Sequence, residues 1–142
     1  MARRNAEYLT HLAQVPLFSA LAKKDLGLVA KRAEDVTVKA GKTLVVEGAT
    51  GHEFFVILSG TASVTRKGRK VATLNAGQWF GELALLDRDV RNASVTAATD
   101  MELAVIGQRE FAGLIDTVPG FSRKLLQATA RRLREYDSKG IH

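Results

Sequence analysis

The chain has 142 residues, of which 46% are hydrophobic and 25% charged, and its formal net charge is +6. This length suits one domain with an apolar core, and no run approaches the roughly 20 apolar residues that a membrane-spanning helix needs. The absence of cysteine excludes disulfides and thiol chemistry, and the polar N-terminus lacks the apolar stretch of a secretory signal, so we expect a cytoplasmic protein without membrane insertion.

The first 35 residues follow a helical pattern that is interrupted at Pro16. Apolar residues recur at spacings of three and four, which is typical of short amphipathic helices. Ser19 precedes the second of these stretches and is a candidate N-cap, with Asp25 as an acid in the following turn. We therefore predict N-terminal helices within residues 1–35.

Residues 36–107 follow a β pattern. Apolar residues often stand two apart from Val36 onward, and glycines recur at Gly41, Gly48, Gly51 and Gly60. Short strands between regularly spaced turns indicate a small sandwich or barrel. Within it, Lys67-Gly68-Arg69 is predicted to be a hairpin tip, and residues 95–106 are predicted to form the closing strands.

The helical period returns after Gly107. Residues 109–116 read as one helix, ended by Val118-Pro119-Gly120. A second helix follows, with one face marked by Phe121, Leu125, Leu126, Thr129, Leu133 and Tyr136. We predict two C-terminal helices over residues 108–137, which makes the fold class α+β.

The segment with the clearest chemistry is Phe80-Gly81-Glu82-Leu83-Ala84-Leu85-Leu86, followed shortly by Arg91. A carboxylate in an apolar run needs hydrogen-bond donors, and Gly81 allows a ligand to approach the backbone closely. The first N–H groups of a short helix at this point would attract an anion, and an arginine fork suits phosphate oxygens. The pattern favours a small anionic ligand with hydroxyl groups, whereas the structural alternative is an ion pair between Glu82 and Arg91.

Residues 77–95 resemble the phosphate-binding cassette of cyclic nucleotide-binding domains, with the Phe-Gly-Glu-Leu-Ala-Leu-Leu run and an Arg-x-Ala-Ser-Val ending. This family occurs in bacterial cyclic AMP receptor regulators, cyclic nucleotide-gated channels and protein kinase A regulatory subunits. The similarity covers nearly the whole chain, because the upstream segments that match in order are Val15-Pro16-Leu17-Phe18, Ala40-Gly41-Lys42-Thr43-Leu44, Glu47-Gly48 and Phe55-Val56-Ile57-Leu58-Ser59-Gly60.

The resemblance implies one domain over residues 1–142. It consists of N-terminal helices (1–35), a small antiparallel β jelly-roll barrel (36–107) with the cassette at 77–95, and a two-helix lid (108–137). In the family the lid moves when ligand binds, which implies a sensor that works by a shift in conformational populations and not by catalysis.

The resemblance also implies a site for cAMP, with cGMP as the alternative, and no further cofactor or metal. Glu82 would accept a hydrogen bond from the ribose 2′-hydroxyl, and Arg91 would pair with the exocyclic phosphate oxygens. Backbone N–H groups after Gly81 and around Ala93 would hold the cyclic phosphate. The implied binding residues are Val71, Phe80, Gly81, Glu82, Leu83, Ala84, Arg91, Asn92, Ala93 and Ser94.

Four positions leave alternatives open. Asn92 stands where relatives often carry Ala, Ser or Thr, so the choice between adenine and guanine stays undecided. Ser94 fits the Ser/Thr position of the family, but a serine in a strand is also a common small polar filler. Arg132 and Tyr136 lie where relatives place residues that reach the base, and the alternative for both is an ordinary helix surface.

The biological setting also stays open at this level. The sensor would act on a protein effector, either separate or fused, and a cytosolic channel domain is one possible origin. A degenerate domain that serves only as an interaction module is another. The basic residues are scattered along the chain, which favours solvated faces over direct DNA binding.

A metal-dependent jelly-roll enzyme of the cupin kind is disfavoured. Such a site needs clustered histidine and carboxylate ligands. The three histidines, His11, His52 and His142, stand in different parts of the chain, and no two of them form a ligand pair on one predicted strand.

Overall fold

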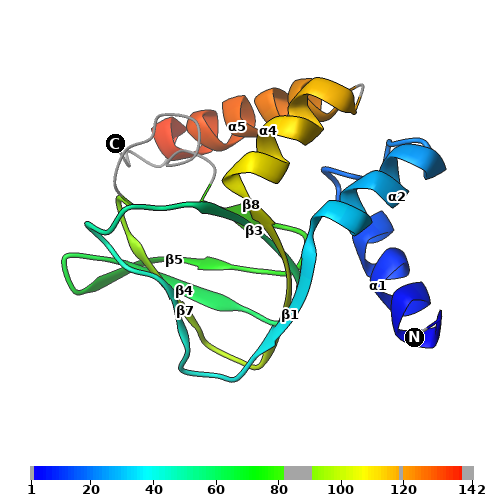
Figure 1. The fold of residues 1–142 in the computed structure, drawn as a ribbon. Coiled ribbons are helices and arrows are strands. Elements are labelled where there is room, and N and C mark those ends of the chain that lie inside the picture. Colours follow the sequence, from blue (N-terminus) through cyan, green and yellow to red (C-terminus); the bar gives the residue numbers. More distant parts are fainter. Residues whose placement is uncertain (1, 82–90, 119, 139–142) are drawn as a thin grey trace.

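The computed structural model describes residues 2–81, 91–118 and 120–138 (Figure 1). Its helices are α1 (Ala2–Gln14), α2 (Lys23–Arg32), α4 (Gln108–Thr117) and α5 (Phe121–Ser138). Its strands are β1 (Glu34–Val38), β2 (Thr43–Val45), β3 (Glu53–Ser59), β4 (Ala62–Arg66), β5 (Arg69–Leu74), β6 (Trp79–Phe80), β7 (Ser94–Ala97) and β8 (Met101–Gly107).

The described strands form two four-stranded sheets in which all pairings are antiparallel. Their orders are β1-β8-β3-β6 and β2-β7-β4-β5. An apolar core lies between the sheets, with Phe55, Ile57 and Phe80 contributed by the first and Val95 and Ala97 by the second. The predicted α+β jelly-roll architecture is confirmed, as an open sandwich of two sheets and not a closed barrel.

The central strand β3 is buried on both faces because the helices cover the outside of its sheet. Phe55 and Ile57 point into the sandwich, whereas Phe54 and Val56 belong to a second core. This alternation explains the continuous apolar run of β3. The helical residues that complete the second core include Leu12, Val29, Phe111, Leu114 and Phe121.

The N-terminal helices pack against each other and share the second core with residues of β3 and β8. Nδ1 of His11 on α1 lies 2.6 Å from a carboxylate oxygen of Glu102 on β8. The prediction that Ser19 caps the second helix is wrong, because α2 begins at Lys23 with Ala22 at the N-cap. The Ser19 hydroxyl donates instead to the carbonyl of Pro16 at 3.1 Å, within hydrogen-bonded turns that span residues 15–21.

The predicted hairpin tip is confirmed. Strands β4 and β5 pair antiparallel and are joined by Lys67 and Gly68, which both have positive φ angles, 53° and 78°. Two left-handed residues give a tight turn whose twist matches that of the strands. In the described part of the chain, no helix has the length and apolarity needed to span a membrane.

Candidate functional site

Arg91 is anchored through its backbone to the turn between β2 and β3. Its N–H donates to the carbonyl of Ala49 at 2.8 Å, and its own carbonyl accepts from the N–H of Gly48 at 2.8 Å. This pair of bonds resembles one rung of an antiparallel ladder. The position of Arg91 is therefore fixed by a segment more than 40 residues earlier, and not only by its neighbours in sequence.

The guanidinium of Arg91 is buried, with 6% of the residue exposed. Nη1 donates to the carbonyl of Gly81 at 2.9 Å, and Nη2 donates to the carbonyl of Glu53 at 2.8 Å. A buried arginine keeps its charge, so such acceptors are needed to offset its lost hydration. The structure thus brings together Gly81 and Arg91, two of the predicted binding residues of the cassette.

Two glycines make room for this arginine. A β-carbon on Gly51 would lie 2.0 Å from Nε of Arg91, and one on Gly81 would lie 2.7 Å from Nη1 and 2.7 Å from the carbonyl of Glu53. Gly81 also has a φ of +95°, which L side chains rarely adopt. Both positions therefore require glycine while Arg91 keeps this conformation.

The residues after Arg91 are tied to the neighbouring elements. The exposed Asn92 accepts a hydrogen bond at its carbonyl from Nε of Arg66 at 3.2 Å. Ala93 is buried, and the hydroxyl of Ser94 accepts from the N–H of Glu47 at 2.9 Å. Ser94 therefore contacts the backbone of the β2–β3 turn.

Phe80 and Val71 occupy contrasting environments. Phe80 is buried in the sandwich and stacks on Phe55, with 4.7 Å between the ring centroids. Val71 is 46% exposed and lies at a break in the β4–β5 register, where Ala72 pairs with Val64 and Lys70 pairs with Thr65. An extra residue at such a bulge is turned away from the regular alternation.

For the other predicted site residues, the structure either describes the backbone alone or does not describe the residue. Glu82, Leu83 and Ala84 fall outside the described residues. Arg132 and Tyr136 belong to α5 by their backbone, but their side chains are not among those described. Their assignments stay predictions.

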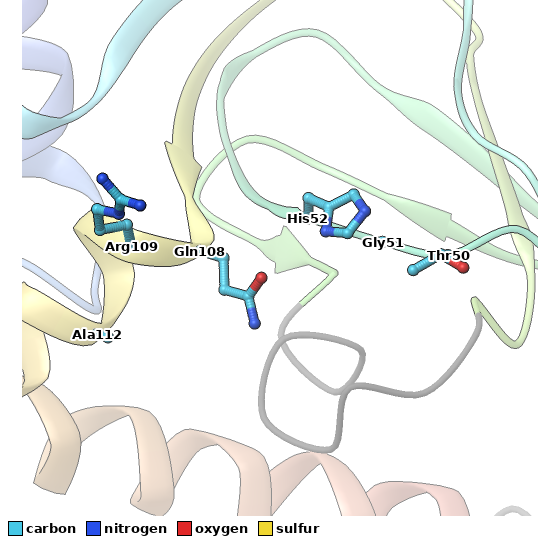
Figure 2. Close-up of a pocket in the computed structure, with 6 residues that line it drawn as sticks. All are labelled: Thr50, Gly51, His52, Gln108, Arg109 and Ala112. Atoms are coloured by element: carbon cyan, nitrogen blue, oxygen red, sulfur yellow. The ribbon is translucent and has the colours of Figure 1, made fainter.

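Two pockets share the Thr50–His52 segment. One, of about 230 Å³, includes Arg91, Gly51 and Val46 in its lining. The other, of about 480 Å³, lies between this segment and the first turn of α4, where Gln108 and Arg109 stand (Figure 2). The segment is joined to α4 by the Gln108 N–H, which donates to the carbonyl of His52 at 2.9 Å. Only the smaller pocket contains the predicted phosphate-binding arginine.

The sequence did not reveal the roles of Gly51 and Glu53 at this site. Gly51 could be read only as one of several turn glycines, since its contact with Arg91 bridges 40 positions. Glu53 contributes its main-chain carbonyl, which carries no signal in the residue type. Among the described residues, no cluster of His, Cys, Asp and Glu is suited to hold a metal ion.

The family is decided by a match over most of the chain. The model of the cyclic nucleotide-binding domain matches residues 35–118, which run from the second residue of β1 through α4. The chain belongs to the cyclic nucleotide-binding domain family. The matched span contains Gly81, Arg91 and the turn that anchors Arg91.

Individual proteins support this assignment. The cAMP-dependent protein kinase regulatory subunit of Schizosaccharomyces pombe is 33% identical over 141 residues, which are 99% of this chain and 34% of that protein. The counterpart of Yarrowia lipolytica is 36% identical over 118 residues, with 82% of this chain and 32% of that protein covered. The chain thus spans about a third of the length of these relatives.

Solved structures agree on the fold. The catabolite activator protein of Thermus thermophilus has a TM-score of 0.79 at 32% identity, over 87% of this chain and 61% of that one. A structure described as PKAR CBD2 with bound Sp-2Cl-cAMPS has a TM-score of 0.81 at 22% identity, over 99% and 94% of the two chains. At that identity the second likeness concerns the fold alone.

Proposed function

We propose that this cyclic nucleotide-binding domain is a sensor of cAMP that regulates a protein effector and has no catalytic activity of its own. The observation that carries the proposal is the buried Arg91, which is held beside Gly81 and lines a pocket. The relatives named as cAMP-dependent regulatory subunits support cAMP as the first ligand to test. Because the chain covers only a third of those proteins, a kinase partner belongs to the proposal as well.

In this proposal the cyclic phosphate binds at Arg91, and N–H groups after Gly81 and around Ala93 complete the phosphate contacts. Glu82 takes the ribose 2′-hydroxyl. The pocket beside Arg91 is about 230 Å³, below the roughly 300 Å³ at which ligand pockets usually start. The sugar and base therefore extend past it, where the exposed Asn92 and Val71 are candidates for contact.

We propose that nucleotide binding at Arg91 is transmitted to α4. The Arg91 guanidinium donates to the carbonyl of Glu53, and the preceding residue, His52, accepts from the N–H of Gln108 at the start of α4. A phosphate that competes for the guanidinium weakens its bond to the carbonyl of Glu53. Because Glu53 follows His52 directly, this change also affects the hydrogen bond between His52 and Gln108. The nucleotide shifts α4 and α5 only by its difference in affinity for the two arrangements.

The direct test is isothermal titration with cAMP and cGMP in parallel at the same salt concentration. A mononucleotide of about 22 heavy atoms, at roughly 0.3 kcal/mol per atom, is expected to bind with a Kd of about 10 μM or tighter. The ratio of the two affinities gives the base preference that Asn92 leaves open. The absence of binding of both up to about 1 mM would refute the sensor and favour a degenerate interaction module.

A comparison of two arginine variants, one for each pocket, shows which pocket binds the ligand. Arg91→Ala is expected to weaken binding by about 1.5–3 kcal/mol, the scale of hydrogen bonds to a charged group. Arg109→Ala removes an exposed arginine from the larger pocket and is the matched control, with affinity unchanged. Thermal unfolding of both variants verifies that they are folded at the titration temperature. The opposite pattern would move the ligand to the α4 pocket.

A further inference from the structure

A dense group of positive charge lies at the tip of the β4–β5 hairpin. We call Arg66, Lys67, Arg69 and Lys70 the basic tip; all four are exposed. In the described part of the chain, the ion pairs involve His11 with Glu102 and Lys39 with Asp100, and none involves the basic tip. Exposed cations without a carboxylate partner project their field into the solvent, which makes this tip a candidate for attracting anions.

The basic tip is held in a defined place. The two left-handed turn residues, Lys67 and Gly68, fix the hairpin, and the N–H of Lys67 donates to a carboxylate oxygen of Glu47 at 2.9 Å. Glu47 thus places one negative charge against the four positive charges of the tip, which offsets only part of the positive field. Glu47 in turn donates its N–H to Ser94.

The basic tip is hydrogen-bonded to residues that lie next to Arg91, where the phosphate is proposed to bind. Nε of Arg66 donates to the carbonyl of Asn92, the residue after Arg91. Through Glu47, the same hairpin is connected to Ser94, three residues after Arg91. Both of these connections join the basic tip to the segment that carries Arg91. Figure 1 shows the β4–β5 hairpin on the side of the sandwich opposite α1 and α2.

We propose that the basic tip steers the anionic cyclic nucleotide toward Arg91 and accelerates its association. This inference rests on the proposed function, since it names a second surface that serves the same site. Charges near a binding site raise the rate of encounter with an oppositely charged ligand, and salt screens them with a Debye length of about 8 Å at physiological ionic strength. The tip acts before contact forms, so it affects the association rate more than the dissociation rate.

The test compares two variants with equal changes in net charge. Lys67→Gln, Arg69→Gln and Lys70→Gln together remove three charges from the tip and leave Arg66 and its bond to Asn92 intact. The control combines Lys23→Gln, Lys24→Gln and Lys31→Gln, which removes three exposed charges from α2 on the far side of the sandwich. Association and dissociation rates of a fluorescent cAMP analogue are measured by stopped flow at about 10 mM and about 500 mM NaCl.

The tip variant is expected to associate between about two- and tenfold more slowly than wild type at low salt, with an unchanged dissociation rate. The difference disappears at high salt, and the α2 control stays close to wild type at both. Equal association rates for the tip variant and the α2 control at low salt would overturn the proposal, as would a change confined to dissociation. If wild type does not bind the analogue at all, the proposed function fails and the steering role fails with it, a result distinct from normal binding without steering.

Discussion

Nε of Arg91 lies so close to the α-carbon of Gly51 that a β-carbon there would be 2.0 Å away. Such a distance is far shorter than any non-bonded contact between heavy atoms. Gly51 does not have a positive φ, so its backbone conformation is open to other residues. The requirement for glycine at this position therefore comes from the arginine and not from the turn.

Gly51→Ala is expected to displace the Arg91 guanidinium and to weaken cyclic nucleotide binding at least about tenfold, or about 1.4 kcal/mol. The reason is that the arginine loses its alignment with the carbonyls of Gly81 and Glu53. Gly27→Ala in α2 is the control, because no atom lies within 4 Å of its added β-carbon. Alanine in place of a helical glycine stabilises by about 0.5–1 kcal/mol, and nucleotide affinity should not change. Equal affinities of the two variants by titration would show that Arg91 is free to shift without loss.

Phe80 directly precedes Gly81 and is held in the core by its stack with Phe55. Phe80→Ala is expected to lower the free energy of unfolding by about 3–5 kcal/mol, since it opens a cavity in the sandwich core next to Gly81. Phe80→Leu keeps most of the apolar volume and loses mainly the aromatic contact, worth about 0.5–1.5 kcal/mol. Urea denaturation measures both values, and equal losses in the two variants would contradict a cavity effect.

Tyr8 on α1 has a buried hydroxyl group and lies away from the candidate site. It is 7% exposed, and its hydroxyl has no hydrogen-bond partner in the described part of the chain. Burial raises the pKa of the Tyr8 phenol, and the carboxylates of Asp35 and Glu102 raise it further. The folded state therefore keeps this proton at pH values where the unfolded state releases it, so stability falls as the pH rises above about 10.

Tyr8→Phe is expected to leave stability at pH 8 unchanged or higher, because no hydrogen bond is lost. Above about pH 10 the variant should gain over wild type, since it lacks the group that ionises on unfolding. Urea denaturation at pH 8, 10 and 11 gives the comparison. A variant that is less stable at pH 8 by about 1 kcal/mol or more would indicate a hydrogen bond at this hydroxyl.

Asp100 joins the turn after β1 to the turn before β8. Its carboxylate accepts the N–H of Ala40 at 2.9 Å and lies 3.7 Å from Nζ of Lys39. These two contacts, with the Ala40 bond the larger, lower the pKa of the Asp100 carboxyl. Its stabilising contribution is complete above the unfolded pKa of about 4 and is lost as the pH falls through the lower folded value.

Asp100→Asn keeps the oxygen that accepts from Ala40 and removes only the charge. The urea midpoint of this variant is expected to lie below that of wild type at pH 6, and the gap should close as the pH falls below about 4. The gap should be small, because Asp100 is exposed and solvent screens its charge. A gap that stays constant from pH 6 to pH 3 would mean that the charge of Asp100 is irrelevant and the amide itself perturbs the turn.

The sequence by itself determined the family, the α+β architecture and the β4–β5 hairpin tip. These follow from local patterns: the apolar period changes between helices and strands, and the run from Phe80 to Leu86 with Arg91 resembles a known cassette. The periodicity could not place α2 correctly, because Ser19 is a good N-cap by type and its hydroxyl is engaged by Pro16 in the preceding turns.

Only the tertiary structure decided what holds Arg91. Its described surroundings include the carbonyls of Gly81 and Glu53, the backbone of Gly48 and Ala49, and the open space at Gly51. Main-chain carbonyls are common to all residues, so residue type does not mark Glu53 or Ala49 as partners of Arg91. The tertiary structure also brought the basic tip, which is contiguous in the sequence at residues 66–70, next to the segment of Arg91. Pairing between distant strands selects those neighbours, and that selection becomes visible only when the chain is folded.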